Sequence, residues 1–110
     1  PRMFFPILQH LTRRLRVLTE DVASLAYLDA YSREARKILL LADQLGISGE
    51  RPDEVLIPHP LTHQELANLV GAPRETVTKI LNEMKERGLL SIDQHRITVL
   101  RKAELTRALF

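Results

Sequence analysis

The side chains best suited to recognise another molecule lie between residues 74 and 82, in a segment with helical spacing. An arginine fork donates several hydrogen bonds, a glutamate accepts them, and threonine, lysine and asparagine add single contacts. At the start of a helix, such groups read base edges in the major groove of duplex DNA. The predicted DNA contacts of this helix are Arg74, Glu75, Thr76, Thr78, Lys79 and Asn82.

The other side of the same helix is apolar. Its residues recur at i, i+3, i+4 and i+7, which is the pattern of a stripe that faces a protein core. In a plainer interpretation, Arg74, Glu75 and Lys79 only form a solvated face and pair with one another. The elements predicted on either side favour the DNA interpretation. The apolar stripe consists of Val77, Ile80, Leu81 and Met84.

A shorter helix and a tight turn precede this segment. Thr62 and Glu65 form a capping box, in which each side chain satisfies a free backbone N–H at a helix start. Gly71 supplies the left-handed conformation of the turn, and Pro73 begins the second helix. This order is that of a helix-turn-helix motif. The shorter helix is expected to bury Leu66, Ala67, Leu69 and Val70.

Two β-prone runs, Leu89–Ile92 and Ile97–Leu100, follow the motif and predict a hairpin, or wing. The wing adds Arg96 to the candidate DNA contacts, and the start of the shorter helix adds Thr62 and His63. For His63, the alternative is a solvated polar residue at the N-terminus of the helix. The predicted fold class is mainly α (α+β), with a winged helix-turn-helix.

The N-terminal segment predicts a dimerisation helix. Its apolar residues alternate at spacings of three and four, the a/d pattern of a coiled coil; packing on its own domain is the alternative. A second helical stretch starts near Asp29, a candidate N-cap, and stops before Gly46. We therefore expect a hinge there, between a dimerisation helix (residues 1–29) and a DNA-binding domain (residues 30–110). The dimerisation residues are Leu8, Leu11, Leu15, Leu18, Val22 and Leu25.

The composition is that of a soluble globular domain. The chain has 110 residues, a net charge of +2, 45% hydrophobic and 27% charged residues, and no cysteine. No run is long and apolar enough for a membrane span, so we expect a cytoplasmic protein without a membrane partner. The four histidines lack metal-site spacing, so no metal is expected. No residue pattern supports an enzyme.

Several of these segments together resemble the Crp/Fnr family of bacterial transcription regulators, in collinear order over almost the whole chain. The segments are residues 25–29, the helix of residues 30–45, residues 61–67, residues 71–77 and residues 88–90. The resemblance implies that residues 6–28 form the long dimerisation helix and residues 61–100 the winged helix-turn-helix. It also implies a homodimer that reads an inverted repeat, with RNA polymerase as a further partner.

The resemblance also assigns roles to single residues. Arg74 would donate to a guanine, and Glu75 would accept from a cytosine amino group. The third base-reading position, usually arginine, is Lys79, whose single ammonium lacks the bidentate fork. Pro73 replaces the serine that often caps the helix, and the wing turn lacks the usual glycine.

Family members carry an N-terminal effector-binding domain, and this chain, which starts at Pro1, has none. We therefore expect part of a longer regulator, with no cofactor in this chain. Leu18-Thr19 stands where cyclic-AMP-binding members have Thr-Ser, which argues against that effector. Two alternatives remain, namely a GntR-type regulator and a winged-helix adaptor that binds protein. The first has its motif at the other end of the chain, and the second would not bind duplex DNA.

Overall fold

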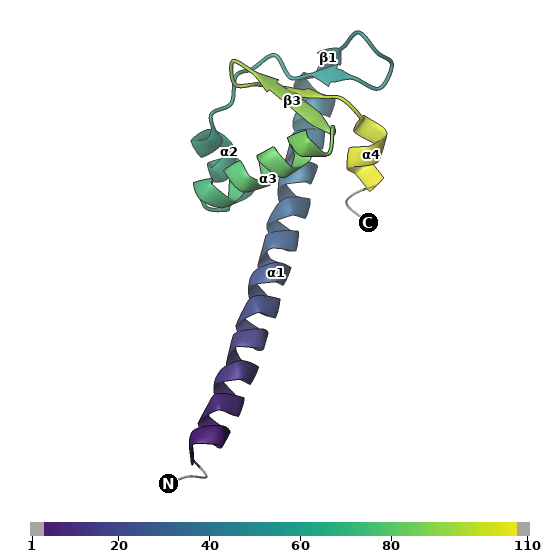
Figure 1. Ribbon diagram of the computed structural model, residues 1–110. Coiled ribbons are helices and arrows are strands. Elements are labelled where there is room, and N and C mark those ends of the chain that lie inside the picture. Colours follow the sequence, from purple (N-terminus) through teal and green to yellow (C-terminus); the bar gives the residue numbers. More distant parts are fainter. Residues whose placement is uncertain (1–3, 108–110) are drawn as a thin grey trace.

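The computed structural model describes the backbone of residues 4–107 and the side chains of residues 6–15 and 22–107. One long helix, α1 (Phe4–Leu45), carries a compact head at its C-terminal end (Figure 1). The head contains helices α2 (His63–Val70), α3 (Arg74–Glu86) and α4 (Lys102–Arg107). It also contains strands β1 (Ile47–Ser48), β2 (Val55–Leu56), β3 (Leu90–Asp93) and β4 (Arg96–Val99). The predicted fold class is therefore confirmed.

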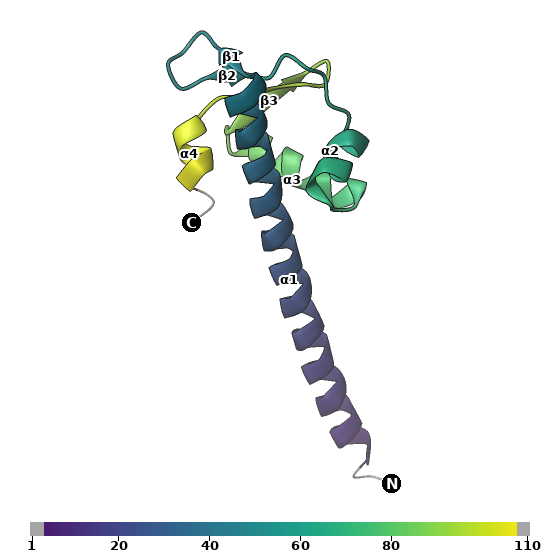
Figure 2. The ribbon, with the colours of Figure 1, turned by 180° about the vertical axis from the view of Figure 1, so that it is seen from behind.

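Helix α1 is continuous through Asp29, so the predicted helix break at this position is wrong. Asp29 lies inside the helix and pairs with Arg33, one turn later, at 3.1 Å between Oδ2 and Nε. No glycine or proline occurs between Pro6 and Leu45, so nothing interrupts the backbone hydrogen bonds. Figure 2 shows α1 running along the back of the head without a bend.

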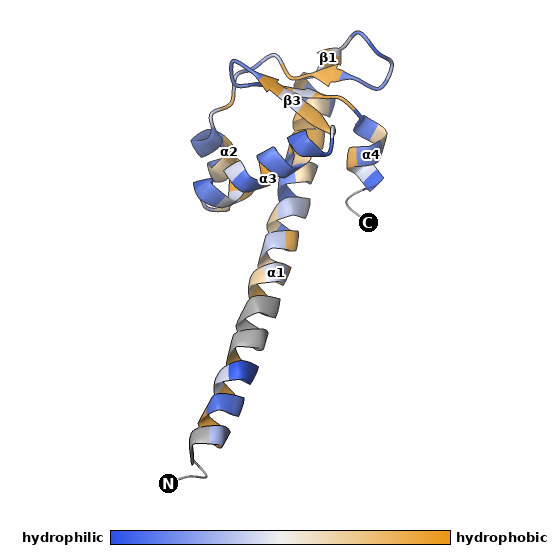
Figure 3. Ribbon diagram, viewed as in Figure 1, coloured by the Kyte–Doolittle hydropathy of each residue, from blue (hydrophilic) through white to orange (hydrophobic). Residues whose placement is uncertain are grey.

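The C-terminal part of α1 supplies one wall of the core. Ala35 and Ile38 are fully buried, and they belong to a single cluster with the apolar residues of α2, α3 and the sheet. Figure 3 shows these apolar segments gathered within the head. Leu69, which was predicted to be buried, is 47% exposed, and Leu45 is 39% exposed. Leu45 is the last residue of α1, and Leu69 lies on the outer face of α2, so neither side chain reaches the core.

The sheet has the strand order β1-β2-β4-β3, and every neighbouring pair is antiparallel. Both predicted wing strands are present as β3 and β4, and the sheet also includes the short strands β1 and β2. Gly46 allows the chain to leave α1 close to this sheet. A Cβ at this position would lie 2.2 Å from the Ala42 carbonyl oxygen and 2.3 Å from Val55 Cγ1. Only glycine fits there without a shift of the backbone.

Within the described residues, the only long helix is too polar to cross a lipid bilayer. The same part of the chain contains no group of three histidine or acidic side chains that could hold a metal ion.

Candidate nucleic-acid interface

Helix α2 begins at the predicted cap. Thr62 is in the extended conformation, and its hydroxyl accepts a hydrogen bond from the Glu65 backbone N–H at 3.1 Å. The Glu65 side chain is exposed and makes no return bond to any described residue, so only half of the predicted capping box forms. Gly71 ends the helix at φ 78°, in the left-handed conformation. The turn that sets the angle between α2 and α3 is therefore as predicted.

Helix α3 separates its residues onto two faces. The predicted stripe of Val77, Ile80, Leu81 and Met84 is at most 1% exposed. Arg74, Glu75, Lys79 and Asn82 are exposed, while Thr76 and Thr78 are half-buried. The helix starts after Pro73, which gives no side-chain cap. Its first-turn N–H groups and the exposed polar face are thus left for an outside partner.

One hydrogen bond joins the two helices of the motif on this surface. His63 Nδ1 lies 2.8 Å from Thr78 Oγ1, and both side chains are half-buried. Burial lowers the pKa of His63, and the positive charges of Arg74 and Lys85 lower it further. Two predicted DNA contacts are therefore one coupled pair. Each had been predicted as a DNA contact, but the hydrogen bond between them had not been predicted.

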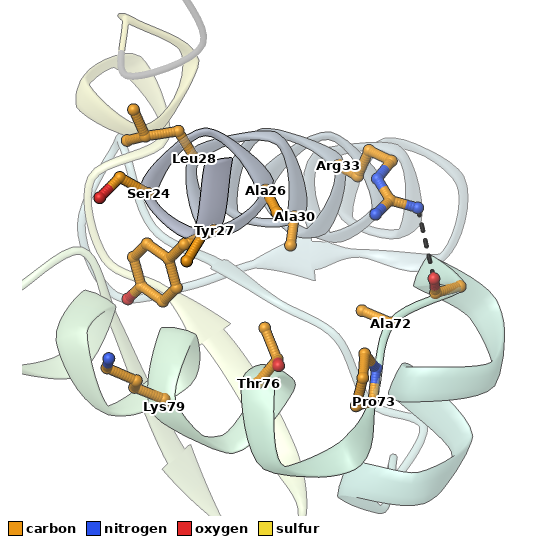
Figure 4. A pocket seen from close by; sticks show the side chains of 12 residues that line it. Ser24, Ala26, Tyr27, Leu28, Ala30, Arg33, Ala72, Pro73, Thr76 and Lys79 are labelled. Atoms are coloured by element: carbon orange, nitrogen blue, oxygen red, sulfur yellow. Dashed lines mark hydrogen bonds between the residues drawn. The ribbon is translucent and has the colours of Figure 1, made fainter. Parts of the chain in front are cut away.

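The Lys79 side chain contacts an aromatic ring on helix α1. Its Nζ lies 4.9 Å from the centre of the Tyr27 ring, the arrangement of a cation–π contact (Figure 4). The Tyr27 hydroxyl donates a hydrogen bond to Glu83, one turn further along α3. Burial and this bond raise the pKa of Tyr27 to about 12. Tyr27 and Glu83 were not among the predicted site residues, because no local pattern pairs residues so far apart in the chain.

A cavity of about 820 Å³ separates α1 from the start of α3 (Figure 4). Its apolar wall includes Leu28, Ala30 and Pro73, and Lys79 lies at one side. At its other side, Arg33 Nη1 donates to the carbonyl oxygens of Val70 at 3.1 Å and Gly71 at 3.4 Å. Arg33 therefore caps the C-terminal end of α2 and fixes the motif against α1.

The wing is a hairpin with a two-residue turn. Gln94 and His95 both have positive φ values, 50° and 63°, as a tight hairpin turn of the type I′ family requires. Arg96, the predicted wing contact, donates from Nε to the Pro58 carbonyl oxygen at 2.9 Å. Its Nη1 also donates to the Gln94 side chain at 3.4 Å. Arg96 therefore holds the turn in place while its side chain stays exposed.

The predicted dimerisation residues form an exposed apolar row on α1. Exposure ranges from 56% at Leu11 to 67% at Leu15 over Leu8, Leu11, Leu15, Val22 and Leu25. The side chains of Leu18 and Thr19 lie outside the described residues. The alternative in which this helix packs on its own domain is wrong, because the described side chains of the row are open to solvent.

These features define a winged helix-turn-helix protein with a long helix ahead of the motif. A family model for the Crp-like helix-turn-helix domain matches residues 32–108. The chain belongs to the Crp/Fnr family of transcription regulators, as the resemblance had predicted. The alternative of a GntR-type regulator is therefore wrong.

Relatives of this chain are regulators by name. It is 33% identical over 107 residues to the CRP-like cAMP-activated global transcriptional regulator of Mycobacterium tuberculosis, covering 97% of this chain and 47% of that protein. The global nitrogen regulator of Synechococcus elongatus is 33% identical over 106 residues, with coverage of 96% and 47%. The catabolite activator protein of Thermus thermophilus superposes with a TM-score of 0.73 at 28% identity, over 94% of this chain and 45% of that one. The chain thus spans about half the length of the curated relatives it matches.

Proposed function

We propose that this chain binds duplex DNA as a homodimer and places α3 in the major groove, as part of a transcription regulator. The observation that carries this proposal is the division of α3 into a buried apolar stripe and an exposed polar face. That face begins with Arg74 and Glu75, which suit guanine and the cytosine amino group. Asn82 and the two threonines, Thr76 and Thr78, supply further polar contacts.

The phosphate backbone is contacted beside α3. Thr62 and His63 lie at the start of α2, and Arg96 lies on the wing next to it, where the Leu61 backbone N–H donates to the His95 carbonyl oxygen at 2.7 Å. These three residues would therefore contact phosphate from one cluster beside the recognition helix. These contacts position the protein on the duplex, whereas the residues of α3 select the sequence.

The exposed apolar row of α1 supports a dimer. An a/d row of leucines typically packs against a second helix in a coiled coil. If two α1 helices paired about a two-fold axis, the same axis would relate the two copies of α3. Residues 1–29 would then serve dimerisation and residues 30–110 DNA binding, within one continuous helix at their junction. The preferred DNA would be an inverted repeat with half-sites about 34 Å apart.

A regulator of this kind works in the cytoplasm and contacts RNA polymerase once it is bound to a promoter. The relatives named above as transcriptional regulators support this role.

An electrophoretic shift with random-sequence duplex, repeated over a series of salt concentrations, tests the DNA-binding step. We expect a shift at low salt that weakens steeply as salt rises, because phosphate binding releases counterions. The absence of any shift at low salt would favour a protein-binding adaptor instead.

A further inference from the structure

The hydrogen bond between His63 and Thr78 leaves each side chain with one further hydrogen-bonding site. His63 uses Nδ1 for this contact, so Nε2 remains, and Thr78 has the second bonding position of its hydroxyl. Neither side chain has another hydrogen-bond partner among the residues whose side chains are described. Both belong to the surface proposed above to face DNA, so these free positions are available to phosphate or base oxygens.

The number of N–H and O–H hydrogens on the two side chains sets how many hydrogen bonds the pair can donate to an outside acceptor. With neutral His63, the pair holds one N–H and one O–H, and one of these two hydrogens is used in the bond between the two residues. Only one hydrogen then points outward, from either Nε2 or the threonine hydroxyl. When His63 is protonated, Nδ1–H donates to Thr78, and both Nε2–H and the threonine O–H are free to donate. A single proton therefore raises the outward donors from one to two.

The surroundings of His63 favour its neutral form in the free protein. It is half-buried, and the charged and titratable groups that act on it are Arg74 and Lys85 on α3 and His95 on the wing turn. Burial and these groups all disfavour the imidazolium. Phosphate oxygens carry the opposite charge, so a DNA backbone beside His63 would favour protonation.

We propose that His63 takes up a proton when DNA binds, and that the hydrogen-bonded pair of His63 and Thr78 then donates two hydrogen bonds to the DNA. Here His63 Nε2–H donates to a phosphate oxygen, and the freed Thr78 O–H donates to a second acceptor on the DNA. The proposal rests on the DNA-binding function above and adds a pH dependence to it. Thr78 is a positioning residue for His63, and His63 for Thr78.

Affinity measured against pH tests this proposal. The dissociation constant for a duplex is determined by fluorescence anisotropy at fixed salt, from about pH 8 to about pH 5.5, the range in which histidine titrates. Uptake of one proton predicts that affinity rises on acidification by up to about tenfold per pH unit. His63→Gln should lose most of this rise, whereas the matched control His10→Gln, at an exposed histidine of α1 outside the motif, should keep it.

Two further variants test the coupling itself. Thr78→Ser keeps the hydroxyl and should keep the wild-type pH dependence, whereas Thr78→Val removes it and should reduce the gain at low pH. NMR titration of the His63 ring adds a direct readout, with a higher pKa in the DNA complex than in the free protein.

The failures of the two proposals are distinguishable. Wild-type protein that binds no duplex at low salt at any pH would remove both the proposed function and this inference. DNA binding whose pH dependence is unchanged in His63→Gln would overturn the present inference only. A ring pKa that is equal in the free and bound protein would overturn it as well.

Discussion

Lys79, a predicted base-reading residue of α3, lies over the aromatic ring of Tyr27 on α1, with 4.9 Å from Nζ to the ring centre. The ammonium therefore has a partner within the protein before it meets DNA. A cation–π contact at such a site is worth about 0.5–1 kcal/mol, and Lys79 must give it up to reach a base or a phosphate.

Replacing the ring should therefore tighten DNA binding. Tyr27→Leu keeps an apolar side chain at the position but removes the aromatic face, so Lys79 no longer has to leave a cation–π partner. We expect about two- to fivefold higher affinity, which is the free energy of that interaction converted to a ratio of dissociation constants. Tyr27→Phe is the control, since it keeps the ring and removes only the hydroxyl that donates to Glu83. Affinities come from anisotropy titrations of one duplex. Equal or weaker binding by Tyr27→Leu would show that the ring does not compete with DNA for Lys79.

Arg74 should carry sequence preference more than affinity. Arg74→Ala should lose about 1–3 kcal/mol of discrimination between the preferred duplex and one with the contacted base pair changed. Its binding to random duplex should weaken only modestly. Arg107→Ala removes an exposed cation of α4 and serves as the control for charge. Competition titrations with the two duplexes measure the ratio, and an unchanged ratio in Arg74→Ala would contradict the assignment.

Glu34 should make the free energy of unfolding depend on pH. Its side chain is fully buried on α1, neither carboxylate oxygen has a hydrogen-bond partner among the described residues, and burial raises its pKa to about 8. Between the ordinary value of 4.5 and about 8, the folded state holds a proton that the unfolded state has lost. Stability from this group is therefore complete below the lower value and is lost as pH rises toward the upper one.

The expected slope has a known upper bound. One proton contributes at most about 1.4 kcal/mol per pH unit to the free energy of unfolding. Urea unfolding at several pH values in this window should show wild-type stability falling with rising pH. Glu34→Leu, which has no titrating group, should be flatter and more stable near the upper end. Parallel pH profiles for the two proteins would show that Glu34 is ionised or solvated in the folded state.

The apolar row on α1 should control the oligomeric state. Leu11→Asp places a charge in the row and should shift the protein from dimer to monomer in sedimentation equilibrium, because a buried unpaired carboxylate is costly. Leu40→Asp is the matched control, since Leu40 is an exposed leucine of the same helix outside the row. A wild-type monomer, or equal dissociation by both variants, would argue against this row as the interface.

Local signals account for the parts of the fold that were predicted. Thr62 at a helix start, Gly71 at the turn and the apolar spacing of α3 each act over one or two turns of chain, so the motif could be read from the sequence. The hinge at Asp29 was predicted because the apolar face changes there. The backbone has no reason to break, however, since no residue nearby removes a helical hydrogen bond.

The contacts within the site depend on distant segments. Tyr27 and Glu83 are 56 positions apart, and their hydrogen bond forms only because α1 passes alongside α3. Arg96, predicted as a DNA contact of the wing, also donates to the Pro58 carbonyl oxygen, 38 positions away in the chain. Residue type and spacing predicted the buried and exposed faces of α3, but not which exposed side chains already contact other parts of the protein.

The most direct test of the whole account is selection of bound duplexes from a random pool by the wild-type chain. We expect the recovered sequences to share an inverted repeat with half-sites about one helical turn apart, which would report both the dimer and the reading helix. The same selection with Arg74→Ala should lose the preference at one symmetric pair of positions. Recovery of a single asymmetric site would contradict the homodimer, and recovery of no shared sequence would contradict base reading by α3.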